Sequence, residues 1–385
     1  MQEIALTDMI SIASFSLALF GAALCLMQDQ NVWPYRILSM VLLASAVMDL
    51  TGIPFAIENP LAAARLEAIF LVLGLVCLTC LVPLFWLYVT AVTSVTPRLP
   101  ARPWLHLTLP FIAAAIATST LFMSRDGWQS LFVETAPSPT GWYFTVAIIG
   151  ELLIIATILQ WGAYLVAIIR ALMRYRRRLF QYVSTTTKRE LRWVWVVIGG
   201  FAIYWIVSAA SVVFDLANTP YNIPDWVDSV FGLAMLVIVL LWGLRQTPGL
   251  APDVDPPAKD DAKYQNSALT DEMAKRLERK LRHAMTEDKL QQDPNLSLWS
   301  LSRHIGASPN YVSQTLNTEI GENFFDFVNR YRIQTAQKLL HETDRAVLEI
   351  TYEVGFNSRS SFYTAFSKVT GETPTAYRKK MSVAA

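Results

Sequence analysis

The chain has 385 residues, of which 53% are hydrophobic and only 16% charged, and this is too apolar for a protein that lies wholly in water. The formal net charge of +1 averages two unlike parts, because the last 123 residues hold 17 Lys and Arg against 14 Asp and Glu, whereas acids outnumber cations before them. The length leaves room for two or three domains.

Seven apolar runs fill the first 245 residues, and each is long enough to cross a bilayer as a helix of about 20 residues. Helices are expected because an open chain in hydrocarbon would leave every backbone amide unpaired. The runs cover about 4–27, 34–57, 66–94, 103–123, 142–169, 191–216 and 226–245. The N-terminus carries Glu3 and Asp8 but no cation before its apolar run, so we expect no cleaved signal peptide. The sequence predicts a seven-helix membrane domain over 1–245.

The cations between these runs predict the orientation of the domain, since short Lys- and Arg-rich loops stay on the cytoplasmic side. With the N-terminus outside, twelve cations fall on the inner side and two, Arg65 and Arg125, on the outer side. Most of the inner ones lie between Arg170 and Arg192, a stretch that we interpret as a topology anchor at anionic headgroups rather than a nucleic-acid site. We expect a bacterial inner-membrane protein with its C-terminus in the cytoplasm.

Several ionisable and aromatic residues fall toward the outer ends of the predicted spans. Charge inside a bilayer is costly, so each acid needs a reason to be there. One interpretation is an outward pocket for a small, cationic signal molecule; the other is acids solvated at the interface beside an aromatic belt. The candidate pocket residues are Asp49, Glu67, Glu151, Asp215, Trp142 and Tyr204.

The three cysteines, Cys25, Cys77 and Cys80, all lie inside apolar runs. Cys77 and Cys80 form a C-x-x-C pair, but with no acid or histidine close by in sequence this spacing favours packing over redox chemistry or metal binding. No metalloprotease, hydrolase, Walker or kinase motif is present either. We therefore expect no enzyme, no catalytic residue, no metal and no cofactor.

The stretch 246–265 is rich in Pro and Asp and has no apolar period, which predicts a flexible linker. About 20 such residues span roughly 25 Å, so the part after it would stay near the bilayer. Next, an apolar residue recurs every four positions at Leu269, Met273, Leu277, Leu281 and Met285. This spacing predicts a helix packed on the core of a C-terminal domain over 266–385; the alternative, a helix that dimerises the chain, could coexist with that packing.

A repeat follows, in which Ser308, Val312, Leu316 and Gly321 recur fifty residues later as Ser358, Phe362, Phe366 and Gly371. In each copy an apolar helix leads to a glycine, Gly306 or Gly355, and a serine then caps a second helix. This order is the helix-turn-helix plan, predicted twice, at about 298–318 and 347–369.

Between the copies, Asn323 to about His341 is predicted to form one helix. Its nineteen residues would measure about 28 Å, close to the roughly 34 Å of one DNA turn. The spacing suits two recognition helices in successive major grooves.

The stretch from Pro294 to Lys379, which includes SPNYVSQTLN, GENFFDFVNRYRI and EVGFNSRSSFYTAFSKVTGETPTAYRK, resembles the AraC/XylS DNA-binding domain over essentially its whole length. The family has alanine where this chain has Ser302 and Thr351, both of which are small. The resemblance implies a seven-helix domain with two helix-turn-helix motifs, in an all-α chain.

The resemblance also implies which side chains read base edges, and the same positions remain polar once the apolar ones take the core. These are Asn310, Ser313, Gln314, Arg359, Ser360 and Thr364. Amides suit adenine and arginine suits guanine. The cations expected to contact phosphates are Arg303, Lys368, Arg378, Lys379 and Lys380.

We therefore predict a membrane-tethered regulator of transcription whose partners are promoter DNA, the lipid bilayer, a small signal molecule, RNA polymerase and a second copy of the chain. The seven-helix half would sense a signal outside the cell or within the bilayer. Two alternatives stay open. The membrane half could be a transporter, or it could be a passive anchor from which proteolysis releases the DNA-binding half.

Overall fold

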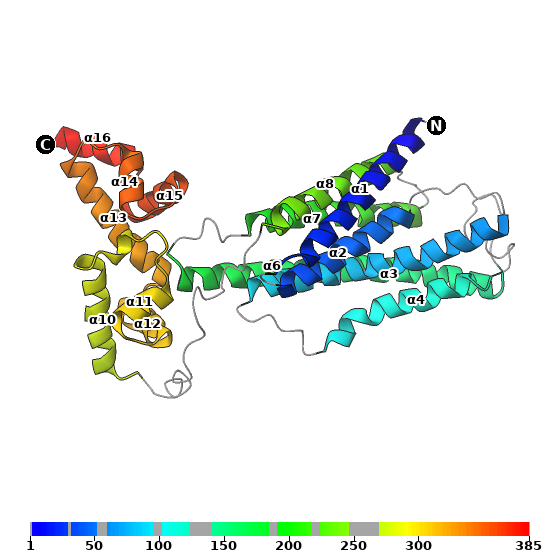
Figure 1. The fold of residues 1–385 in the computed structure, drawn as a ribbon, viewed down its shortest axis with the longest axis horizontal. Coiled ribbons are helices and arrows are strands. Elements are labelled where there is room, and N and C mark those ends of the chain that lie inside the picture. The colour runs from blue at the N-terminus through cyan, green and yellow to red at the C-terminus, as the bar shows by residue number, and fades with distance from the viewer. Residues whose placement is uncertain are drawn as a thin grey trace. The chain divides into compact units, whose positions relative to one another are not determined.

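The computed structural model describes residues 2–29, 32–51, 60–94, 102–123, 140–184, 191–217, 224–245 and 269–384. Within these ranges every regular element is a helix, apart from one isolated antiparallel bridge between Val183 and Ser297 (Figure 1). The predicted all-α fold class is confirmed. The predicted linker, 246–265, lies outside the described residues.

The chain divides into two compact units. The first comprises 1–172 and 191–248, and the second 173–190 and 249–385. Helix α6 (Trp142–Tyr182) contributes to both, because its residues from Met173 on belong to the second unit. The apolar runs alone had not indicated that the segment 173–190 would belong to the C-terminal unit.

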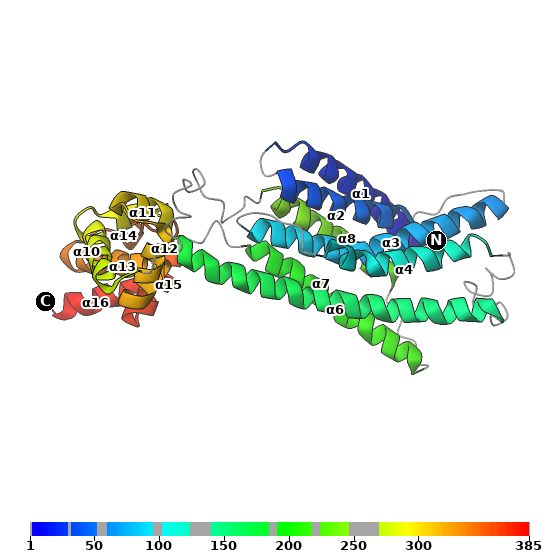
Figure 2. The ribbon, with the colours of Figure 1, turned by 90° about the horizontal axis from the view of Figure 1, so that it is seen from below.

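The first unit is built from long apolar helices, and both views show α1, α2 and α3 as neighbours (Figures 1 and 2). In this unit α1 also packs on α8, α3 on α4, and α7 on α8. The helices are α1 (Gln2–Leu26), α2 (Val32–Thr51), α3 (Pro60–Thr93), the 3-10 turn η1 (Pro103–Leu107), α4 (Thr108–Thr120), α6 up to Leu172, α7 (Arg192–Leu216) and α8 (Asp225–Gly243).

These helices are apolar on their outer faces as well as toward one another. Leu159 on α6 and Ile203 on α7 are 67% and 64% exposed, while Leu38 and Val197 are completely buried. A helix that is hydrophobic all round is typical of a membrane span or of the interior of a large protein. Six helices of the described chain are long and apolar enough to cross a membrane.

The fourth predicted span, 103–123, differs from the other six. Its apolar helical part, Trp104–Thr120, falls short of the length of a regular span and combines η1 with α4. A 3-10 turn rises about 2.0 Å per residue against about 1.5 Å in an α-helix, so η1 and α4 together still reach about 30 Å. The fifth span differs in the other direction, because α6 continues to Tyr182 instead of ending near residue 169.

The second unit begins with the end of α6 and continues through seven α-helices and two short turns among the described residues. They are α10 (Asp271–Thr286), the 3-10 turn η2 (Leu290–Gln292), α11 (Leu298–Ile305), α12 (Pro309–Thr315), the π-helical turn η3 (Leu316–Ile320), α13 (Phe324–Glu342), α14 (Val347–Glu353), α15 (Arg359–Thr370) and α16 (Pro374–Ala384). Helix α10 packs on the core as predicted, since Leu277, Leu281 and Met285 are buried, although Met273 is exposed.

Two hydrophobic clusters form the core of the second unit, and α13 contributes to both. Phe327 and Val328 of α13 pack with Leu301 and Val312 of the first motif. One turn later along α13, Ile333 and Ala336 pack with residues of the second motif, among them Phe362 and Phe366. The long helix predicted between the repeats thus joins two half-domains, each with its own core (Figure 1).

Candidate nucleic-acid interface and ligand pocket

The first helix-turn-helix motif consists of α11, a turn at Gly306, and α12. Ser297 and Ser300 form a reciprocal cap at the start of α11, and Gly306 adopts a left-handed conformation with φ 66°. Ser308 then caps α12, because its hydroxyl accepts a hydrogen bond from the Tyr311 amide at 3.3 Å. The serine and glycine signals of the sequence therefore produce the predicted geometry here.

The second motif repeats this plan with α14, a turn at Gly355, and α15, but its turn is more crowded. Ser358 caps α15 through the Ser361 amide at 3.2 Å. Gly355 has φ 95°, and a β-carbon placed on it would lie 2.5 Å from the carbonyl oxygen of Gln291. Close by in sequence, Asn357 donates a hydrogen bond to the carbonyl oxygen of Pro294 at 3.3 Å. This turn therefore packs against the backbone of 291–294.

The predicted base-reading residues lie on α12 and α15, on the sides that the core leaves free. Buried residues alternate with them along each helix, Val312 and Thr315 on α12 and Phe362, Ala365 and Phe366 on α15. Five of the six predicted residues are exposed and one is half-buried; they are Asn310, Gln314, Arg359, Ser360 and Thr364, and then Ser313.

Arg359 is the cation among these residues, and its own helix positions it. Its guanidinium carbon lies 4.9 Å from the centre of the Tyr363 ring, one turn later, and its terminal nitrogen donates to the Tyr363 hydroxyl at 3.2 Å. A hydrogen bond with Thr375 is the main cause that lowers the pKa of Tyr363, and Arg359 acts in the same direction. The contact with Tyr363 already restricts the conformations of the Arg359 side chain, so Arg359 would lose less conformational entropy on binding.

The five predicted phosphate-contacting cations differ in what they already contact. Arg303 and Lys379 are exposed. Lys368 pairs with Asp326 at 2.7 Å and Lys380 with Glu372 at 3.5 Å, both at exposed positions where such pairs are weak. Arg378 is half-buried and donates to the carbonyl oxygen of Arg345 at 2.6 Å, so it also serves the fold of the domain.

Ser302 and Thr351, the two positions at which the AraC/XylS domain that the sequence resembles has alanine, behave differently. Thr351 is buried, but its hydroxyl donates to the carbonyl oxygen of Val347 at 2.8 Å. The hydroxyl of Ser302 is buried with no hydrogen-bond partner among the described residues. A buried unpaired hydroxyl lowers the stability of a fold by about 1–3 kcal/mol, so serine at 302 is expected to be less favourable than threonine at 351.

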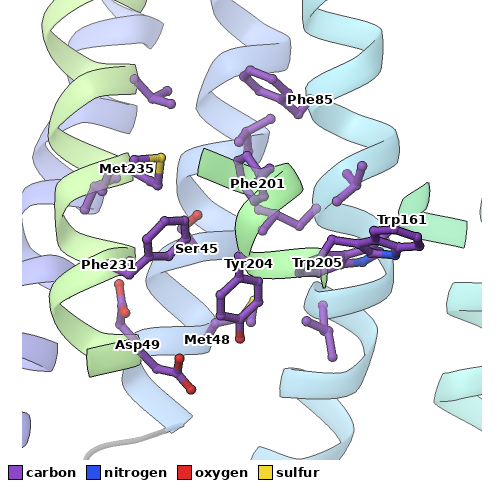
Figure 3. Close-up of a pocket in the computed structure, with 18 of the residues that line it drawn as sticks. Ser45, Met48, Asp49, Phe85, Trp161, Phe201, Tyr204, Trp205, Phe231 and Met235 are labelled. Atoms are coloured by element: carbon purple, nitrogen blue, oxygen red, sulfur yellow. The ribbon is translucent and has the colours of Figure 1, made fainter. Parts of the chain in front are cut away.

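A cavity of about 360 Å³ lies between the helices of the first unit (Figure 3). Helices α1, α2, α3, α6, α7 and α8 all line it, mostly with apolar and aromatic side chains. Figure 3 shows Asp49 and Tyr204 toward one end and Phe85 toward the other, with Phe201 between them. The Tyr204 ring stacks on Phe231 with centroids 5.3 Å apart and an angle of 7°.

The cavity includes two of the six predicted pocket residues, Asp49 and Tyr204. Glu67, Glu151 and Trp142 do not line it; they are exposed on α3 and α6. The side chain of Asp215 lies outside the described residues. The helix positions of these acids had been predicted, but the face that each helix turns inward depends on its neighbours.

Two lining residues escaped the sequence analysis as pocket candidates: Asp228 on α8 and Trp161 on α6. Asp228 could have been found in the sequence, because it is an acidic residue near the start of the last predicted span. Trp205 donates its indole N–H to the carbonyl oxygen of Ile158 at 2.7 Å, whereas the indole N–H of Trp161 is buried with no partner among the described residues.

The described residues contain no group of three or more His, Cys, Asp or Glu side chains that could hold a metal ion. The three cysteines are free thiols: Cys25 is buried, and Cys77 and Cys80 are half-buried.

Comparison with known proteins concerns the second unit. A family model described as a helix-turn-helix domain matches residues 301–380. The uncharacterized HTH-type transcriptional regulator YtdP of Bacillus subtilis is 33% identical over 88 residues, and the uncharacterized transcriptional regulatory protein YesN of the same organism is 35% identical over 91 residues. Each match covers 23% of this chain, and the chain spans only 11% of the length of YtdP and 25% of YesN.

Among solved structures, the C-terminal domain of AraT, a response regulator from Geobacillus stearothermophilus, is 28% identical. It covers 30% of this chain and 88% of its own length, with a TM-score of 0.26. The C-terminal domain of the two-component response regulator yesN from Fusobacterium nucleatum is 27% identical and covers 27% of this chain and 98% of its own length, with a TM-score of 0.25.

Proposed function

Because the C-terminal part of the chain carries a helix-turn-helix domain of the AraC type, we propose that the protein is a membrane-tethered regulator of transcription that binds specific DNA sequences. The observation that carries the proposal is the pair of capped helices, α12 and α15, each with polar side chains exposed opposite a buried apolar face. Helices of this kind read base edges in the major groove.

The membrane half of the proposal is supported by six helices of the described chain that are long and apolar enough to cross a membrane, and by a shorter apolar helix over Trp104–Thr120. The excess of cations in alternate loops favours an inner-membrane protein with its N-terminus outside and its DNA-binding domain in the cytoplasm. Association of two copies and contact with RNA polymerase stay predictions.

The cavity of the first unit supports a sensing role. Its lining is mostly apolar and aromatic, with the carboxylates of Asp49 and Asp228 among the polar groups. In an apolar surrounding a carboxylate attracts a cation far more strongly than in water. We propose that this cavity binds a small signal molecule with an apolar body and a positively charged group.

The DNA-binding proposal is tested by mapping the DNA bound by the intact chain in cells, followed by titration of the purified chain in lipid nanodiscs with a mapped site and a scrambled one. A clear preference for the mapped site supports the proposal. Equal affinity for both at moderate salt contradicts it, because phosphate contacts alone do not distinguish sequences.

Arg359→Ala should weaken binding to the mapped site by roughly tenfold to a hundredfold, the equivalent of about 1–3 kcal/mol, and relax the preference at one base pair. Lys379→Ala is the matched control: it should weaken mapped and random DNA alike and lower the salt dependence by about one ion. Competition titrations with single-base variants measure both effects. An equal loss on mapped and random DNA for Arg359→Ala would show that Arg359 only contacts phosphate.

Asp49→Asn should change the output of a reporter gene under the mapped promoter, because it removes the charge that faces the cavity. Glu67→Gln is the control, since Glu67 is exposed and does not line the cavity. Immunoblots of membrane fractions check that both variants accumulate normally. A reporter response that is the same for wild type and Asp49→Asn would argue against the sensing role.

The transporter and the passive anchor are distinguished from a sensor by two further measurements. Uptake of a fluorescent organic cation into vesicles containing the purified protein would favour transport. A soluble fragment beginning near residue 250 on immunoblots would favour release by proteolysis.

A further inference from the structure

Helix α6 is longer than a membrane requires. Its 41 residues measure about 60 Å, twice the roughly 30 Å of a bilayer's hydrocarbon core. From Met173 onward it belongs to the compact unit that contains the helix-turn-helix motifs, together with Val183 and Ser184 just after it. The C-terminal unit is therefore joined to the rest of the chain at this segment as well as through the chain that precedes α10.

Two aromatic contacts hold the end of α6 in the second unit. The Tyr182 ring stacks on Trp299 of α11, with centroids 4.9 Å apart and an angle of 13°. The Phe180 ring meets Phe325 of α13 edge to face at 4.8 Å. Aromatic pairs in these geometries stabilise a contact beyond the area that they bury.

Backbone pairing follows directly after the helix. The Ser184 amide donates to the carbonyl oxygen of Leu296 at 3.2 Å, and the Ser184 hydroxyl donates to the same oxygen at 2.7 Å. Val183 pairs with Ser297, the residue that caps α11. The segment is thus bonded to the chain at the point where the first helix of the first motif begins.

Arg332 of α13 makes this contact specific. It is completely buried, and burial lowers its pKa to about 10, which still leaves it charged at neutral pH. Its guanidinium donates to the carbonyl oxygens of Gln291 and Asp293, each at 2.7 Å, and to the carbonyl and hydroxyl oxygens of Ser184 at 3.3 and 3.2 Å. A buried cation needs such acceptors, and Ser184 supplies two of them.

We propose that these contacts form a coupling clasp through which the membrane helices regulate the first helix-turn-helix motif. The α6 clasp consists of Phe180, Tyr182, Val183 and Ser184 on one side and Leu296, Ser297, Trp299, Phe325 and Arg332 on the other. The proposal rests on the proposed function. It adds that the signal reaches DNA binding through α6, the helix that also supplies Trp161 and Leu165 to the cavity.

The position of the clasp predicts the direction of its effect. It holds the start of α11 and, through Arg332, the helix α13 that both cores share. It does not involve Asn310 or Gln314, which remain exposed. A closed clasp therefore orders the first motif without covering its recognition helix, and its release should weaken binding to DNA.

Hydrogen exchange of the intact chain in nanodiscs tests whether the clasp exists. The Ser184 amide should be protected, and Tyr182→Ala and Ser184→Ala should speed exchange across 180–184 and 296–299 by roughly tenfold or more. Gln181→Ala is the control, because Gln181 is exposed between two clasp residues. The exchange rates of the α15 amides report whether the C-terminal unit is still folded. If Tyr182→Ala also speeds exchange in α15, the result for Ser184→Ala, which removes only one oxygen atom, decides whether the clasp exists. Fast exchange over 180–184 in the wild type overturns the clasp.

DNA titration of the same samples tests whether the clasp regulates. Tyr182→Ala and Ser184→Ala should lower affinity for the mapped site by roughly tenfold, and the mapped site should in turn raise protection of 180–184, since coupling between two sites is reciprocal. Affinities within twofold of wild type in both variants overturn the coupling even if the clasp is seen. If the wild type does not prefer its mapped site, the proposed function is refuted instead. The exchange test of the clasp stays valid in that case, because it does not involve DNA.

Discussion

Gly355→Ala is expected to disrupt the second helix-turn-helix motif, at a cost of about 2–5 kcal/mol in the free energy of unfolding of the C-terminal unit. Gly355 has φ 95°, a conformation that side chains with a β-carbon rarely adopt. The added carbon would also lie 2.5 Å from the carbonyl oxygen of Gln291 and 2.9 Å from that of Gln292. Because both obstacles are backbone atoms, no side chain can rotate away to make room.

The strain should spread beyond the turn, because the Gln291 carbonyl also accepts a hydrogen bond from the buried Arg332. Gly306→Ala is the matched control, since Gly306 holds the equivalent turn of the first motif with φ 66° and nothing within 4 Å of its added carbon. In Gly306→Ala the unfavourable backbone conformation alone should lower the free energy of unfolding by about 1–2 kcal/mol. Opening free energies from hydrogen exchange of the intact chain in nanodiscs measure both. Equal losses in the two variants would contradict the close approach at Gly355.

Phe366→Ala is expected to destabilise the second half-domain by about 3–5 kcal/mol, because it leaves a cavity in a small core. Phe366 is 0% exposed, and its ring packs against Phe362 with centroids 5.6 Å apart and against Tyr377 at 5.5 Å. The second core consists of few residues, so little else can move in to fill the space. This loss is a large part of the stability of an ordinary domain.

Val369→Ala on the same helix is the control, because Val369 is 48% exposed and should lose less than about 0.5 kcal/mol. Exchange rates of amides in α15 and α16, compared with those in α10, measure the change. The α10 amides should be affected less, since α10 packs in the first core. Loss of protection over α10 and α15 to the same extent would show that the two cores unfold as one unit.

Most of the secondary structure of the second unit could be predicted from the chain because the signals are local. Ser308 and Ser358 cap helices, and Gly306 and Gly355 end or turn them, whatever lies farther away. The apolar positions four residues apart, such as Val312 and Leu316, are buried as the periodicity predicts. The polar positions between them then had to face outward, which is why five of the six proposed base-reading residues are exposed.

The first unit was less predictable, because hydrophobicity identifies its long apolar helices but does not show which side of each helix turns inward. An apolar helix has no polar face that marks its outer side, so Asp49 and Glu67 were equivalent in the sequence. Packing separates them, since Asp49 lines the cavity and Glu67 does not.

The amino-acid order by itself determined the all-α class, the apolar helices of the first half and the doubled helix-turn-helix plan, because periodicity, capping and chain length act over a few residues. Only the tertiary structure decided that Ser184 bonds to Arg332, 148 positions later, and that Gly355 but not Gly306 touches another backbone. These contacts depend on surfaces that meet only after the helices have packed. A buried cation or a crowded turn is therefore defined by its partners, which no local pattern of residues encodes.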